Sequence, residues 1–173
     1  MLKLCTLLIS LSLAITSPQN DTEDTLIPHT RLKHKADFVD SQPYVVKSVK
    51  WLENTPLNQN EKLHGQVRSF LFAWMEGAGN VHVTVLSDIV DITNNYTLLI
   101  IYMGECALYD LDHPDAPNQT QGALQGIRAM IKVYNKKQGV TTDSNIENLI
   151  SLDSKGQLDQ FVADKFAPKK KKH

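Results

Sequence analysis

The sequence contains little cysteine, few aromatic residues and no apolar run long enough to cross a membrane. Two of its 173 residues are cysteines and 7% are aromatic. Cys5 lies in an N-terminal apolar run, so we expect the processed chain to keep only Cys106 and to fold without an internal disulfide. The most apolar internal stretch, residues 96–111, is interrupted by Gly104 and Glu105 and is shorter than the roughly 20 residues of a transmembrane helix. Burial of a core must therefore stabilise the fold.

Motifs of the known catalytic and cofactor-binding classes are also missing. No nucleophile elbow, phosphate-binding loop or HExxH zinc motif occurs in the sequence. We therefore predict a protein that uses no cofactor or metal and is more consistent with binding than with catalysis. The nearest approach to a metal cluster is Asp110, Asp112, His113 and Asp115, whose carboxylates and imidazole fall within six residues. Their spacing matches no calcium loop and Asp115 is placed to cap the next helix, so a structural role is the preferred interpretation.

Positive charge is absent from the middle of the chain. Residues 72–127 contain no Lys or Arg, whereas the residues from 128 onward are rich in lysine. This asymmetry either attracts a charged partner or lets the acidic middle and the basic end pack beside each other. Acidic residues at the C-terminal end of a helix cost stability through the macrodipole, which favours a use for them. The candidate binding residues are Glu76, Glu105, Asp110, Asp112, His113 and Asp115.

The chain is expected to have four segments. Residues 1–16 combine a charged start, an apolar run and small residues, which predicts a signal peptide and an exported protein, either periplasmic or secreted. Residues 17–40 are polar and predict a flexible leader. Residues 41–167 are expected to form the helical domain, and residues 168–173 form a basic tail of a composition that contacts anionic surfaces weakly.

The helical domain is predicted to be a single all-α bundle of five or six helices. The first helix should begin near Ser41 and end before Pro56, and the second has apolar residues from Leu63 to Met75 at helical spacing. Further apolar faces occur in residues 124–134, 146–150 and 158–166. Alternating valines near residues 81–85 indicate a short extended connector.

Residues 96–111 should form the central helix of this bundle. The stretch is apolar on all sides, as is typical of a helix inside a protein, and Asn94 or Asn95 can cap it. Glu105 is the only charge among its inner residues, and a buried carboxylate needs a cation, a proton or water. We expect an ion pair with Arg68 or Arg128, and we prefer Arg128 because its helix follows the central one directly.

One short segment carries a family resemblance. Residues 72–78, FAWMEGA, lie at the end of the second predicted helix. They resemble the aromatic and glycine signature of periplasmic immunity proteins, which neutralise secreted bacterial toxins. The resemblance covers this one helix end and implies a small exported helical protein that binds another protein.

These observations favour an exported, non-catalytic protein that binds another macromolecule, as an immunity protein, an inhibitor or a chaperone does. We expect the partner to be a protein and not a nucleic acid. A carrier of an apolar ligand is a first alternative, because the predicted helices contain many aromatic and Met residues. A hydrolase that uses Glu105 with Asp110 or Glu76 is a second alternative.

Overall fold

The computed structural model describes residues 23–83 and 93–166. Within these ranges the chain is helical and contains no strand, which confirms the all-α class. The helices are α1 (Glu23–Leu26), α2 (Lys35–Asp40), α3 (Gln42–Asn54), α4 (Glu61–Gly77), α6 (Tyr96–Asp112), α7 (Gln119–Asn135), α8 (Ser144–Ser154) and α9 (Leu158–Phe166). Of the expected connector, residues 81–83 are irregular, and residues 84–85 lie outside the described ranges. The predicted signal peptide and basic tail also lie outside them.

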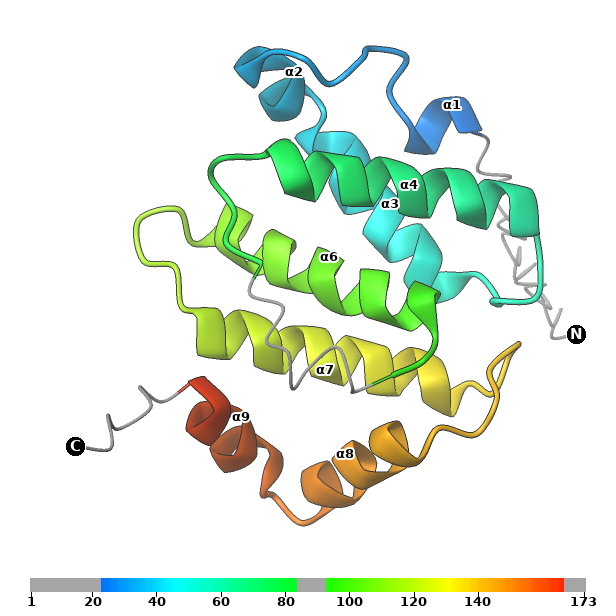
Figure 1. The fold of residues 1–173 in the computed structure, drawn as a ribbon, viewed down its shortest axis with the longest axis vertical. Coiled ribbons are helices and arrows are strands. Elements are labelled where there is room, and N and C mark those ends of the chain that lie inside the picture. Colours follow the sequence, from blue (N-terminus) through cyan, green and yellow to red (C-terminus); the bar gives the residue numbers. More distant parts are fainter. Residues whose placement is uncertain (1–22, 84–92, 167–173) are drawn as a thin grey trace, which may run out of the picture.

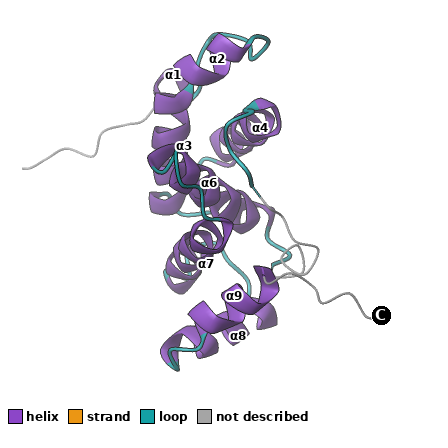
Figure 2. Ribbon diagram, turned by 90° about the vertical axis from the view of Figure 1, so that its left-hand side faces the viewer, coloured by secondary structure: helices purple, strands orange, loops and turns teal. Residues whose placement is uncertain are grey.

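Helix α6 lies at the centre of the molecule. It contacts α3 and α4 on one side and α7 on the other, and α8 and α9 pack on α7 (Figure 1). The view in Figure 2 shows the same order of layers, with α6 between α3 and α7. Leu98, Ile100 and Ile101 are at most 1% exposed, as an all-round apolar helix requires. Asn95 caps α6, because its Oδ1 accepts from the backbone N–H groups of Thr97 and Leu98 at 3.0 and 3.2 Å.

Two glycines allow the neighbouring helices to approach α6 closely. A Cβ on Gly104 of α6 would lie 2.6 Å from Cγ2 of Val49 in α3. A Cβ on Gly126 of α7 would lie 2.5 Å from the carbonyl oxygen of Tyr102 in α6. Side chains larger than hydrogen at these positions would push the backbones apart, so glycine sets the spacing of α3, α6 and α7.

The start of α7 differs from the prediction. Asn118 caps this helix by accepting the N–H of Gln121 at 3.2 Å, whereas Asp115 is exposed in the preceding loop. The reason is that Pro114 and Pro117 keep residues 113–117 out of the helix, which moves the first turn beyond the reach of Asp115.

The described part of the expected leader contains α1 and α2 and contributes to the core. Leu26 is 2% exposed, and its carbonyl accepts from the hydroxyl of buried Ser48 at 2.7 Å. The carbonyl of Phe38 accepts from the indole of Trp74 at 2.8 Å, and the Phe38 ring lies against Gly77. Residues 23–40 thus differ from a solvated leader, because isolated apolar residues in a polar segment are anchored by α3 and α4. Trp74 and Gly77 of the FAWMEGA segment have this packing role.

Candidate functional site

The predicted binding residues fall into an exposed group and a buried group. Glu76, Asp112, His113 and Asp115 are exposed, whereas Glu105 and Asp110 are only 2% and 4% exposed. The candidate site is therefore divided between a surface and an interior cluster, although the sequence places five of these six residues within eleven positions.

The exposed group lies at one end of the molecule. Glu76 is the residue before the last of α4, Asp112 is the last residue of α6, and Asp115 lies in the loop that leads to α7. The C-terminal ends of α4 and α6 and this loop lie at the same end in Figure 1. We call Glu76, Asp112 and Asp115 the acidic end.

His113 is held in place beside the acidic end. Its Nδ1 lies 2.8 Å from the carbonyl oxygen of Tyr109, and its ring stacks on the Tyr109 ring with centroids 4.2 Å apart. Since a carbonyl oxygen only accepts, Nδ1 carries the proton in this contact. These two contacts fix the orientation of the His113 ring at the end of α6.

Asp110 has a structural partner. Its carboxylate accepts the backbone N–H of His82 at 2.6 Å, and the His82 ring nitrogen Nδ1 lies 3.8 Å from the same oxygen. The buried carboxylate thus attaches the segment after α4 to the last turns of α6. Asp110 and Glu105 lie on one helix but have separate partners.

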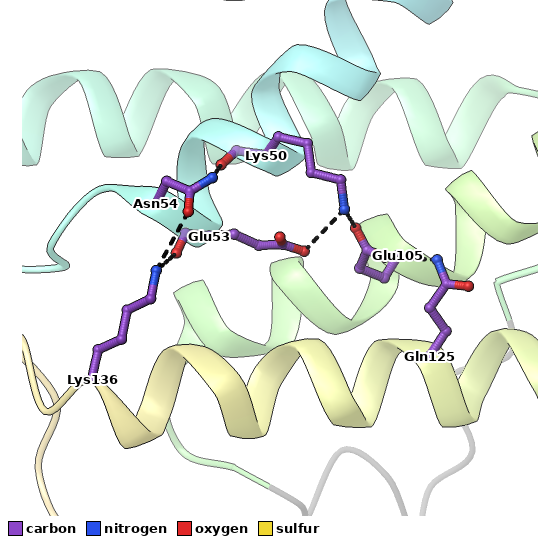
Figure 3. Close-up of polar contacts among 6 residues, drawn as sticks. All are labelled: Lys50, Glu53, Asn54, Glu105, Gln125 and Lys136. Atoms are coloured by element: carbon purple, nitrogen blue, oxygen red, sulfur yellow. Dashed lines mark hydrogen bonds and ion pairs between the residues drawn. The ribbon is translucent and has the colours of Figure 1, made fainter. Parts of the chain in front are cut away.

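Glu105 lies in a polar cluster of four side chains between α3, α6 and α7, in which the two glutamates are buried and Lys50 and Gln125 are exposed (Figure 3). The Lys50 ammonium is 2.6 Å from Glu105 Oε1 and 3.5 Å from Glu53 Oε1. The Gln125 amide donates to Glu105 Oε2 at 2.7 Å. We call Lys50, Glu53, Glu105 and Gln125 the polar cluster.

The predicted arginine partner of Glu105 was wrong. Arg128 pairs with Asp159 at 2.6 Å and with Asp153 at 3.7 Å, and Arg68 donates to the Thr97 hydroxyl at 2.7 Å. Lys50 supplies the cation instead. Its long stem lets an ammonium group that starts off the apolar face of α3 reach a carboxylate on α6, while the side chain stays 50% exposed.

The two carboxyl groups of the polar cluster differ in acidity. Burial and the hydrogen bond to Glu105 raise the pKa of Glu53 above its ordinary value of 4.5. Burial alone would also raise the pKa of Glu105, but hydrogen bonds from Lys50 and Gln125 and the Lys50 charge lower it below 4.5. Burial acts against the charge of Lys50, yet the hydrogen bond and charge of Glu105 raise its pKa above 10.5. The cluster thus holds the Lys50 ammonium, the ionised carboxylate of Glu105 and the carboxyl of Glu53, which retains its proton to a higher pH than Glu105 does.

A second lysine joins α7 to the end of α3. The Lys136 ammonium donates to the carbonyl of Glu53 at 2.6 Å and lies 3.5 Å from the Asn54 amide oxygen (Figure 3). A cation at the C-terminal end of a helix satisfies its last carbonyl groups and its macrodipole. This contact fixes the position of Glu53 relative to α7.

Lys50 and Glu53 were not identified as site residues from the sequence. Both lie off the apolar face of their helix, which is typical of solvated positions. The only signal in the sequence is that Glu53 directly follows Leu52, an apolar residue of the same predicted helix, and lies three residues after Lys50. Helical spacing could suggest this i,i+3 pair, but only tertiary packing shows that it faces α6.

The carboxylates of the alternative hydrolase do not converge on a shared cleft. Glu105 is engaged by Lys50 and Gln125, Asp110 by His82, and Glu76 is exposed on α4. The aromatic residues that suggested a carrier include Trp74, Tyr102 and Tyr134, which are at most 1% exposed and belong to the packed core. Over residues 23–83 and 93–166, no group of three or more His, Cys, Asp and Glu side chains is arranged to hold a metal ion.

None of the helices in the described ranges has both the length and the apolar character needed to cross a membrane.

No family model, curated protein or solved structure matches the chain. The interpretation of the site therefore depends on its own geometry.

Proposed function

We propose that the protein is an exported, non-catalytic binding protein and that its acidic end contacts a basic region of a protein partner. The observation that carries this proposal is that three exposed carboxylates from separate segments, Glu76, Asp112 and Asp115, lie at the same end of the molecule. We propose that the helices packed around α6 hold these three carboxylates in position.

The position of these carboxylates supports a role in binding. Asp112 ends α6, where a negative charge opposes the helix macrodipole at a cost of about 0.3 to 1 kcal/mol. Phe72, one turn before Glu76 on α4, is 43% exposed. Complementary charge accelerates and orients association, while exposed aromatic residues contribute contact area at interfaces. The acidic end supplies the charge, and Phe72, one turn before Glu76, supplies the exposed aromatic surface.

The proposal can be tested by partner capture with matched charge variants. The tagged protein would be incubated with the exported fraction of its source cells, and captured proteins would be quantified by mass spectrometry. The test variant is Glu76→Gln/Asp112→Asn/Asp115→Asn. The control is Glu23→Gln/Asp24→Asn/Glu61→Gln, which removes three exposed carboxylates from α1 and the start of α4, at the opposite end in Figure 1.

We expect the test variant to lose a captured basic protein by about tenfold or more, whereas the control retains it. Removal of Asp112 should not unfold the protein, because it relieves an unfavourable charge at the end of α6. Thermal unfolding of both variants checks this point. Equal capture by the wild type and the test variant would show that the acidic end is not the binding surface.

A further inference from the structure

His64 is a buried histidine in the first turn of α4. Its side chain belongs to a residue that is only 1% exposed. Its Nε2 lies 3.2 Å from the carbonyl oxygen of Pro56, and its ring packs on the Trp51 ring with centroids 4.7 Å apart. The imidazole therefore connects the start of α4 with the end of α3 and with the loop between these two helices.

The hydrogen bonding of His64 fits the neutral imidazole. Since a carbonyl oxygen only accepts, Nε2 carries the proton in the contact with Pro56. Nδ1 is then the unprotonated nitrogen, and it is buried without a hydrogen-bond partner among the described residues. Protonation would turn Nδ1 into a second buried N–H donor that has no acceptor, which costs free energy. The folded arrangement therefore disfavours the imidazolium ion.

The charge nearest in effect to His64 also opposes protonation. Arg68 lies one turn later on α4 and is held by its contact with the Thr97 hydroxyl of α6 at 2.7 Å. Burial and the Arg68 charge lower the pKa of His64 below its ordinary value of 6.5, while the hydrogen bond to Pro56 acts in the opposite direction. Among the described residues, no carboxylate contributes to this shift.

The other charged groups near the start of α4 have different surroundings. On α3, Lys50 and Glu53 belong to the polar cluster, and on α6, Tyr96 lies beside Arg68 with its ring centroid 5.8 Å from Cζ. Exposed charges follow on α1 and on the first turn of α4: Glu23, Asp24, Glu61 and Lys62. An imidazolium ion at position 64 would therefore lack a buried anion to stabilise it.

The loop between α3 and α4, residues 55–60, is held from two sides. The backbone N–H of Leu57 donates to the carbonyl of Gln138, beyond the end of α7, at 3.0 Å. On the α4 side, His64 holds the loop through the Pro56 carbonyl. Asn60 has a left-handed backbone with φ of 48°, which is uncommon for a residue other than glycine. The conformation of the loop therefore depends on the contacts that hold it.

We propose that His64 is an acid-sensitive switch: protonation of its imidazole in mildly acidic solution drives the ring away from Trp51 and Pro56 and releases the loop at residues 55–60. In neutral solution the ring is uncharged and the loop stays attached. After protonation Nδ1–H finds an acceptor only in water, so the ring must leave its buried position. The switch lies at the end of the molecule opposite the acidic end (Figure 1), and it is independent of the proposed function.

The proposal can be tested by nuclear magnetic resonance on the full chain between about pH 4.5 and 8. The ring resonances of His64 report its protonation, and the protection of the Leu57 amide against hydrogen exchange reports the attachment of the loop. Because the folded-state pKa is lowered, the stabilising contribution of neutral His64 is present above pH 6.5 and is lost as the pH falls through the folded-state pKa. We expect His64 to titrate below pH 6.5 and the protection factor of Leu57 to fall about tenfold or more with the same midpoint.

Matched variants separate His64 from other titrating groups. His64→Gln has an amide donor for the Pro56 carbonyl but takes up no proton in this range, so we expect the protection of Leu57 to become independent of pH. His29→Gln is the control, because the His29 side chain is 83% exposed between α1 and α2, and it should retain the wild-type response. Glu53→Gln, in the polar cluster, should retain it as well.

The proposal is overturned if His64 titrates at or above pH 6.5, if the protection of Leu57 is equal above and below the transition, or if His64→Gln keeps the wild-type response. Loss of the response in Glu53→Gln would assign the pH dependence to the polar cluster and also reject the switch. If His64→Gln does not fold, the wild type alone decides, because different midpoints for His64 protonation and Leu57 protection contradict the proposal. None of these variants changes the acidic end, so partner capture tests the proposed function separately.

Discussion

At the scale of single residues, the ionisation of Glu105 depends on Lys50 and Gln125. The ammonium and the amide each contact one carboxylate oxygen, and Glu53 supplies a third hydrogen bond. A buried carboxylate without such partners would be strongly disfavoured. Lys132 of α7 adds positive charge near Glu53, and Lys136, which directly follows α7, donates to the Glu53 carbonyl. The cluster is therefore arranged so that one negative charge, and not two, is readily accommodated.

The polar cluster predicts how stability depends on pH. Since the pKa of Glu53 is higher in the folded state than its ordinary value of 4.5, the contribution of Glu53 is fully present below pH 4.5 and is lost as the pH rises through the folded-state pKa. Glu105 has the opposite sign: its contribution is present above pH 4.5 and is lost as the pH falls through its lowered pKa. Glu53→Gln keeps a donor for Glu105 but cannot ionise. We therefore expect the variant to become more stable relative to the wild type as the pH rises above 4.5.

Urea unfolding at a series of pH values between 4.5 and 8 measures this difference. Glu61→Gln, at the exposed start of α4, is the control and should follow the wild-type curve. Parallel curves for the wild type and Glu53→Gln over this range would contradict the assignment of the raised pKa to Glu53.

At the scale of helices, the contact between α6 and α7 depends on a glycine that cannot be replaced without displacement. The Cβ of an alanine at position 126 would lie 2.5 Å from the carbonyl oxygen of Tyr102 and 2.7 Å from its ring atom Cδ2. Because one of these atoms belongs to the backbone of a buried helix, it cannot move aside as the end of a flexible side chain can. This contact places Gln125, the residue before Gly126, within reach of Glu105.

Gly126→Ala and Gly65→Ala should change stability in opposite directions. Alanine favours a helix interior over glycine by about 1 kcal/mol. At Gly126 the overlap with Tyr102 should exceed this gain and destabilise the protein by about 1 to 3 kcal/mol. At Gly65 of α4 the nearest atom to a new Cβ is Arg68 Nη2 at 3.9 Å, so we expect a gain of up to about 1 kcal/mol. Urea unfolding of both variants measures the difference, and stabilisation by Gly126→Ala would show that α6 and α7 can separate at little cost.

The helices were predictable from the sequence because their apolar spacing and end signals are local. The apolar run of α6, the face of α4 from Leu63 to Met75 and the cap at Asn95 all follow from neighbouring residues. The need of Glu105 for a cation was also predictable, because it follows from burial. The identity of the cation was not, since Lys50 is 55 residues away and reaches Glu105 only through the packing of α3 on α6. Chain adjacency favoured Arg128, which instead faces the acidic residues of α8 and α9.

At the scale of the whole molecule, the described part of the N-terminal segment belongs to the packed structure. The sequence of residues 23–40 predicts a polar leader, because its few apolar side chains are scattered among polar ones and form no helical or strand periodicity. In the structure, α1 contacts α3 and α4, and α2 contacts α3. The boundary of the folded unit is therefore set by a few anchoring contacts and not by composition.

Leu26→Ala should distinguish an anchored segment from a solvated one. Leu26 is 2% exposed and belongs to the hydrophobic core, although it lies in a helix of only four residues. Removing its buried atoms should cost about 2 to 5 kcal/mol in the free energy of unfolding, with values near the lower limit if α1 can shift to fill the space. Val39→Ala, in α2 of the same segment, is the control, because Val39 is 50% exposed and its truncation should change stability by no more than about 0.5 kcal/mol. Chemical unfolding of both variants gives the comparison. If Leu26→Ala were as stable as Val39→Ala, residues 23–40 would behave as a leader in solution, and the folded domain would begin at α3.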